Sequence, residues 1–162
     1  MEPEMERLGE QSVQIVELLE SILADEYVLA MRTRDARRNV NGINVTRLRK
    51  LFGEHCTYLD AAVVDMERRT RSLGRLTPVT FSHSMKATRL GPHNEKLTGQ
   101  NEIIKALLED HQSVIRSLSG ARRSRTKSDI LGFVVQLLDQ HLETVDTLRE
   151  WMEEVNPEKP RK

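Results

Sequence analysis

The sequence has few cysteine, proline or aromatic residues, and these shortages limit the kinds of fold and cross-link that the chain can form. Its 162 residues include 1 Cys, 5 Pro and 8 Gly, and 4% are aromatic. A single cysteine excludes an internal disulfide, and we interpret Cys56, which lies in an apolar-periodic segment, as a buried free thiol. The scarcity of helix breakers leaves long uninterrupted segments and favours an all-α protein.

No charge sign dominates and no targeting segment is evident. Lys plus Arg number 25 and Asp plus Glu number 25, so attraction to nucleic acid would have to come from a local patch. The acidic start MEPEMERLGEQ lacks an apolar run after a basic stretch, so we expect no secretory signal, no membrane span and a cytoplasmic location. The length predicts one domain over residues 1–162.

Four segments carry apolar residues at intervals of three or four, which predicts four amphipathic helices. The expected helices span about residues 6–38, 45–72, 100–119 and 128–154. We expect the first three to end where glycine supplies a left-handed backbone, at Asn41-Gly42, Gly74 and Gly120. Ser128 is a candidate N-cap for the fourth helix, which should stop before Pro157.

The connection between the second and third helices is expected to be a long crossover. Residues 75–99 contain Pro78 and Gly91-Pro92 and are too many for a tight turn, although a short helix near Ser82–Thr88 fits within them. Short first and third connections around a long middle one predict a bundle with up-down-down-up order. A cytokine-type bundle is the alternative, but it has two long crossovers.

Several motifs on these helices resemble one protein family. TRDARRNVNG at 33–42 resembles T-x-N-F-H-W-N-V-x-G of the DNA-protection-during-starvation (Dps) mini-ferritins, and LRKLFGEH at 48–55 resembles L-H-x-L-F-E-E-Q. LDAAVVDMERRTRSLG at 59–74 and the last two helices continue the resemblance without a gap. It implies a ferritin-like four-helix bundle with a long crossover, assembled into a cage of typically twelve subunits. It also implies iron storage with ferric iron binding, a stress response and DNA protection.

The resemblance also implies a di-iron ferroxidase site at each two-fold interface. In the family, two His and an acid come from one subunit and two acids from its partner, and these positions are occupied here by Arg37, Arg49, Gly53, Val64 and Arg68. Arginine offers no usable lone pair, and glycine and valine have no side-chain donor, so none of the five can bind iron. Ferroxidase activity at this site is therefore expected to be absent.

The histidines do not form a replacement site of the full-length ferritin type. That site needs Glu-x-x-His on one helix, and no histidine here has Glu three residues before it. We interpret His55, His111 and His141, on apolar faces, as core or interface histidines. A rearranged metal site drawing on His55, Asp60, Asp65 or Glu67 stays open.

Arginines at the former ligand positions would gather at the two-fold seam of such a cage. Like charges in a partly buried seam need neutralising groups. Two interpretations stay open, a salt-bridged interface and a bound phosphate or sulfate, which suits the guanidinium fork. The residues of this candidate cluster are Arg37, Arg38, Arg49, Arg68, Asp35, Glu54 and Asp65.

The loop before the fourth helix is basic, where family members often carry acids near the pores through which ferrous ions enter. Positive charge there would repel ferrous ions, or it would neutralise DNA phosphates in repeated copies around a cage. A solvated loop is the third interpretation. The candidate pore or DNA contacts are Arg122, Arg123, Arg125, Lys127 and Asp129.

Taken together, the residues and the resemblance predict a Dps-like mini-ferritin shell protein of iron homeostasis and stress protection, without a conventional ferroxidase site. Iron is implied by the resemblance alone, and no cofactor is assigned. The expected partners are copies of the same chain, with DNA and co-assembly with a relative left open. The alternatives are an iron-oxidising ferritin with a rearranged metal site and a helical interaction module that forms no cage.

Overall fold

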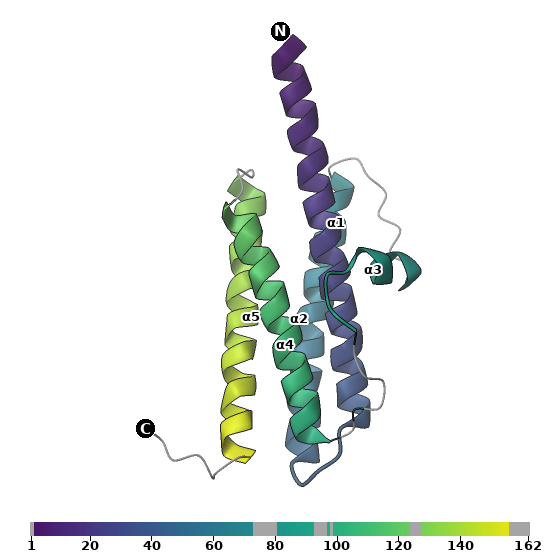
Figure 1. The fold of residues 1–162 in the computed structure, drawn as a ribbon, viewed down its shortest axis with the longest axis vertical. Coiled ribbons are helices and arrows are strands. Elements are labelled where there is room, and N and C mark those ends of the chain that lie inside the picture. Colours follow the sequence, from purple (N-terminus) through teal and green to yellow (C-terminus); the bar gives the residue numbers. More distant parts are fainter. Residues whose placement is uncertain (1, 73–80, 93–96, 98, 124–127, 156–162) are drawn as a thin grey trace.

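The computed structural model describes residues 2–72, 81–92, 97, 99–123 and 128–155, and these form a helical bundle. Its helices are α1 (Glu2–Asn39), α2 (Val45–Ser72), α3 (Phe81–Ala87), α4 (Gln100–Arg123) and α5 (Ser128–Val155). Figure 1 shows the four long helices side by side, with α2 and α4 running opposite to α1 and α5 and the short α3 lying beside α1. The expected up-down-down-up order is therefore confirmed.

The bundle forms because each long helix buries one apolar stripe. On α2, Leu48, Phe52, Leu59 and Met66 are spaced four or seven residues apart, and all are fully buried. Burying side chains of this size contributes about 1.5–3 kcal/mol each, the largest favourable contribution to folding. Within the described residues, no helix has the length and low charge needed to cross a lipid bilayer.

The α1–α2 connection contains the expected glycine turn. Gly42 has a φ of 144°, the only positive φ among the described residues, and a Cβ there would collide with the side-chain amide of Gln100. The amide N–H of Val40 donates to the carbonyl of Ala36 at 2.9 Å, which closes the last turn of α1. The turn therefore lies directly against the start of α4.

Two helix limits differ from the expected ones. The third long helix does not end at Gly120 but continues to Arg123, because Ala121 is buried and extends the apolar stripe that includes Leu118. Gly120 meets no neighbour, and one glycine costs a helix only about 1 kcal/mol. At the other end of the chain, α1 begins at Glu2 rather than near residue 6. Gly74 lies outside the described residues.

Polar side chains of α1 attach the segment after α3 to the bundle. One carboxylate oxygen of Asp25 accepts the Thr88 hydroxyl at 2.8 Å and the Arg89 amide N–H at 2.7 Å. Burial raises the pKa of Asp25, although these hydrogen bonds oppose the shift.

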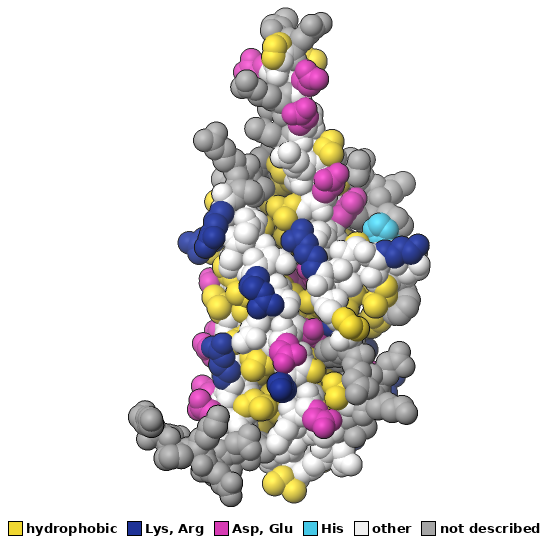
Figure 2. Space-filling view, viewed as in Figure 1, with side chains coloured by type: hydrophobic (Ala, Val, Ile, Leu, Met, Phe, Trp, Pro, Cys, Tyr) yellow, Lys and Arg dark blue, Asp and Glu magenta, His cyan; other side chains and the backbone are white. Residues whose placement is uncertain are grey.

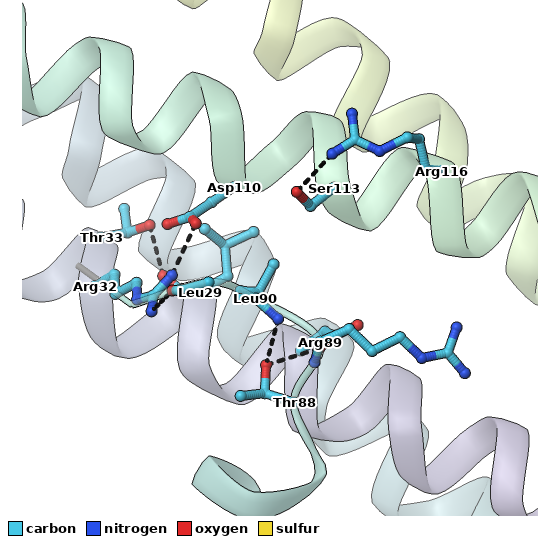
Figure 3. Close-up of polar contacts among 11 residues, drawn as sticks. Leu29, Arg32, Thr33, Thr88, Arg89, Leu90, Asp110, Ser113 and Arg116 are labelled. Atoms are coloured by element: carbon cyan, nitrogen blue, oxygen red, sulfur yellow. Dashed lines mark hydrogen bonds and ion pairs between the residues drawn. The ribbon is translucent and has the colours of Figure 1, made fainter.

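Arg32 donates to Asp110 of α4 at 2.7 Å and to the Gly91 carbonyl, and Figure 3 shows Arg32 and Asp110 meeting between the two helices. The crossover is thus hydrogen-bonded to the bundle.

Replacing Gly42 with alanine should destabilise the protein by about 1–3 kcal/mol, because a side chain at positive φ is strained and would displace Gln100. Urea denaturation measures the loss. The matched control is Gly120→Ala, which should stabilise the protein by about 0.5–1 kcal/mol because Gly120 is helical and meets no neighbour. Equal destabilisation by both substitutions would contradict the turn at Gly42 and the continuation of α4 through Gly120.

Candidate functional site

The positions of the family's interface ligands lie in the last turn of α1 and along α2 from Arg49 to Arg68. Arg37 is in the last turn of α1, while Arg49 and Gly53 are one turn apart near the start of α2. The three arginines Arg37, Arg49 and Arg68 are exposed, and Val64 is 63% exposed. These four side chains are therefore accessible to another subunit, but the donor set of the five positions does not fit iron.

The guanidinium group of Arg37 lies against the Cα atom of Gly53. A Cβ built on Gly53 would lie 3.3 Å from Cζ and 3.4 Å from Nε of Arg37. The guanidinium group therefore lies directly over α2, where the family's acid ligand would project. A methyl group at position 53 would crowd the guanidinium of Arg37 by a few tenths of an ångström, so the two departures from the family pattern are in direct contact.

The candidate salt-bridge cluster is only partly joined within one chain. Arg68 pairs with Asp65 at 2.9 Å one turn away, and Asp35 accepts the Asn39 amide at 3.0 Å. Exposed pairs of this kind contribute about 0–1 kcal/mol. Arg38, Arg49 and Glu54 are exposed. An anion or salt-bridge cluster that needs a second subunit stays a prediction.

Other surface candidates are described in part. Arg122 and Arg123 end α4 and are exposed, while Arg125 and Lys127 lie outside the described residues, as does the side chain of Asp129. Asp60 does not join His55 in a rearranged site but pairs with Arg34 of α1 at 2.8 Å on the surface.

A polar cluster in the bundle interior brings together residues from all four long helices. Glu26 of α1, His111 of α4 and His141 of α5 have 0% exposure, and His55 of α2 has 7%. We call these four residues the core cluster. The three histidines are buried, as expected, but their convergence on one carboxylate was not predicted.

Hydrogen bonds connect three members of the core cluster, Glu26, His141 and His111, into a chain. His141 Nε2 lies 2.6 Å from Glu26 Oε1, and His141 Nδ1 lies 2.8 Å from His111 Nδ1. The ring centroids of His111 and His141 are 5.0 Å apart, and those of His55 and His111 are 6.4 Å apart. The carboxylate of α1 is therefore linked through two imidazoles to α4, with a third imidazole beside them.

Burial favours the neutral form of His55 and of His111. It lowers the pKa of His55 to about 4 and that of His111 well below its ordinary value, with His141 and His55 adding to the second shift. Tyr58 borders the cluster, donates or accepts one hydrogen bond with Thr144 at 2.7 Å, and has a pKa raised mainly by burial. Near neutral pH, His55 and His111 therefore carry free lone pairs.

Three atoms of the core cluster are buried without a hydrogen-bond partner: Glu26 Oε2, His55 Nδ1 and His111 Nε2. Buried polar atoms are usually paired, and each unpaired one costs about 1–3 kcal/mol. In the described part of the chain, no group of three or more His, Cys, Asp or Glu side chains could hold a metal ion. The core cluster is therefore a group of buried polar side chains in which some hydrogen-bonding atoms have no partner.

Sequence reasoning missed Glu26. Its signal was a carboxylate inside an apolar stripe, four residues after Ile22 and three before Leu29, which are both buried. Our search for Glu-x-x-His required the acid and the histidine on the same helix. Here the acid is on α1 and its histidine partner is on α5, 115 residues away in the sequence.

Comparisons with known proteins agree with this architecture. A family model described as a ferritin-like domain matches residues 16–157. A low temperature-induced protein of Nostoc sp. is 26% identical over 148 residues, which cover 89% of this chain and 83% of the relative.

Solved structures of the same fold include a Dps protein of Vibrio cholerae, with a TM-score of 0.81, 19% identity, and coverage of 88% of this chain and 91% of that one. A dodecameric thioferritin of Bacteroides fragilis has a TM-score of 0.85 and 10% identity, covering 97% and 96% of the two chains. These likenesses show that the fold is shared. Because the family model spans most of the sequence, the chain belongs to the ferritin-like domain family, with the subunit fold of the Dps mini-ferritins.

Proposed function

We propose that the chain is the subunit of a Dps-like cage, a cytoplasmic mini-ferritin of iron homeostasis and stress protection that has no ferroxidase site between its subunits. The observation that carries the proposal is Arg37 lying over Gly53, in the space where a ligand carboxylate would project. This arrangement replaces two iron ligands with a permanent positive charge.

The chemistry of the surrounding positions supports the same conclusion. Arg49 and Arg68 add positive charge to the exposed part of α2, and Val64 supplies no donor atom. A ferrous ion approaching this surface meets repulsion instead of ligands. Iron would therefore be cargo of the cage, and its oxidation would not begin at the subunit interface.

The proposed cage is a closed shell of twelve identical subunits. Its support is the bundle itself, which is shared with a dodecameric thioferritin over 97% of the chain. Val64 and Ile43 are large apolar side chains that the single chain leaves 63% and 95% exposed, and contact between copies would bury such surface.

DNA contact would depend on the ends of α4. On the face shown in Figure 2, side chains of both charge signs are interspersed, so that face offers no single-sign surface to a phosphate backbone. Arg122 and Arg123, which are exposed at the end of α4, are the described residues that repetition around a cage could turn into a DNA-binding surface.

The assembled wild-type particle should oxidise ferrous iron, with oxygen or peroxide, no faster than buffer. Stopped-flow absorbance of ferric products measures the rate, and sedimentation velocity confirms a discrete particle. A variant with His at Arg37 and Arg49 and acids at Gly53, Val64 and Arg68 is the positive control and should gain saturable oxidation. Saturable oxidation by the wild-type particle would overturn the proposal.

The contact between Arg37 and Gly53 should appear as energetic coupling. Gly53→Ala should stabilise the helix by about 0.5–1 kcal/mol when Arg37 is replaced by alanine, and by less when Arg37 is present, because the new methyl group crowds the guanidinium. Urea denaturation of the four proteins gives the coupling. Gly132→Ala, on α5 with no neighbour within 4 Å, should have the same effect in both backgrounds. Equal gains from Gly53→Ala in both backgrounds would show that Arg37 does not occupy this space.

A further inference from the structure

The first part of α1 projects beyond the rest of the bundle (Figure 1). Val16 is the first buried residue along α1, and every described side chain before residue 15 is exposed. A Cβ built on Gly9 would meet no atom within 4 Å. We call residues 2–14 the arm. Its described side chains take no part in the packing of the bundle interior.

The arm continues the apolar side of α1 past the end of the bundle. Met5 lies eleven residues before the buried Val16, which is about three helical turns, so both residues are on the same side of the helix. Met5 is 73% exposed and Val13 is 47% exposed. Most helices owe their stability to the packing of an apolar face, and Gly9 costs the arm about 1 kcal/mol relative to alanine. These features are typical of a helix that packs against another molecule.

The charge of the arm restricts what that molecule can be. Residues 2–14 contain four glutamates and one arginine, and Glu4, Glu6 and Glu10 are exposed. Figure 2 shows acidic and apolar side chains together on the projecting end. Negative charge of this density repels nucleic-acid phosphates and anionic lipid headgroups. The surface that binds the arm should therefore be basic, with an apolar side chain available for Met5.

The turn between α1 and α2 has these properties. Residues 38–50 contain four basic residues and no acidic one. Ile43 lies among them and is 95% exposed, more than any other large apolar side chain in the described part of the chain. We call the exposed side chains of this segment the turn surface; they include Arg38, Ile43, Arg47, Arg49 and Lys50. An apolar centre with charged residues around it is the usual anatomy of a protein interface.

We propose that the arm of one copy of the chain docks on the turn surface of a second copy. Met5 packs against Ile43, and the glutamates of the arm pair with the basic side chains around it. A second copy is the partner because every copy carries both halves of this complementary pair. The inference goes beyond the proposed function and does not depend on a closed shell or on the absence of interface oxidation.

The arm cannot reach the turn surface of its own chain. Met5 and Arg38 are separated by 33 residues of one helix, or about 50 Å at 1.5 Å per residue. The contact therefore joins different surfaces of two copies, arm to turn. Such head-to-tail contacts leave a free arm and a free turn surface at the ends of each pair, so further copies can be added.

Reversing the charges tests the pairing in the whole protein, with association followed by sedimentation velocity. Glu6→Lys combined with Glu10→Lys should weaken association about tenfold or more, because like charges then face each other. Arg38→Glu combined with Lys50→Glu should have the same effect. All four substitutions in one chain should restore association, because the opposite charges have only been exchanged.

The control for charge reversal is on α5. Asp146→Lys combined with Glu150→Lys makes the same change of charge, at exposed positions with the same four-residue spacing, and should leave association unchanged. Arg47 is kept in every variant because its guanidinium stacks on the Trp151 ring at 4.7 Å. Wild-type association should also weaken as salt rises toward about 1 M, where the Debye length is about 3 Å.

Disulfide cross-linking tests the contact itself. In a Cys56→Ser background, Met5→Cys combined with Ile43→Cys should give disulfides between chains, because bonded cysteines need Cα atoms about 4.4–6.8 Å apart. Each of the two substitutions alone should give far less cross-linking. Met5→Cys combined with Leu142→Cys, which places the second thiol at an exposed position of α5, is the matched control.

Circular dichroism shows whether each variant is folded. Wild-type protein that does not associate would overturn the inference, as would full association of the Glu6 and Glu10 variant. A charge-exchanged chain that stays dissociated would show that the turn surface does not bind the arm. A discrete cage whose Met5 and Ile43 cysteine variant cross-links no more than the control pair would also overturn the inference, while leaving the proposed function intact.

Discussion

Burial of the Glu26 carboxylate is the constraint on which the rest of the interior depends. A carboxylate with no exposure requires partners, and His141 provides one hydrogen bond from the opposite side of the bundle. His141 in turn requires a partner for its second nitrogen, which it finds in His111 of α4. One buried acidic side chain on α1 thereby determines which polar groups α4 and α5 must contribute, and an apolar bundle of the same length would carry no such requirement.

The α1–α2 surface and the core differ in how their polar side chains are satisfied. At the α1–α2 face, two departures from the family pattern contact each other, since the guanidinium of Arg37 lies against Gly53. In the core, by contrast, polar residues are retained and incompletely satisfied. The positions that the resemblance assigns to iron ligands thus hold arginine, glycine and valine, while the interior contains a set of buried nitrogen and oxygen atoms.

Much of the fold was predictable because it follows from short-range patterns. The buried stripe of α2 is visible as a three- and four-residue spacing, and the turn at Gly42 follows from the backbone freedom of glycine. Gly120 misled the prediction because an exposed glycine within a helix and one that ends a helix look alike in sequence. Burial of Ala121, which decides between them, is a tertiary effect.

The candidate site was less predictable, because its contacts join distant segments. The hydrogen bond from His141 to Glu26 spans 115 residues, so neither residue predicts the other from local spacing. The contact between Arg37 and Gly53 likewise depends on how α1 packs against α2. Each of these residues was visible in the sequence, but their proximity is set by helix packing.

Asp25 and Glu26 are consecutive on α1, and their carboxyl groups bind different parts of the protein. Asp25 binds the segment after α3 on the outside of the bundle, and Glu26 binds His141 on the inside. A rotation or slip of α1 that released one of these contacts would release the other as well. The position of the crossover and the position of the histidines in the interior are therefore both tied to the same turn of α1.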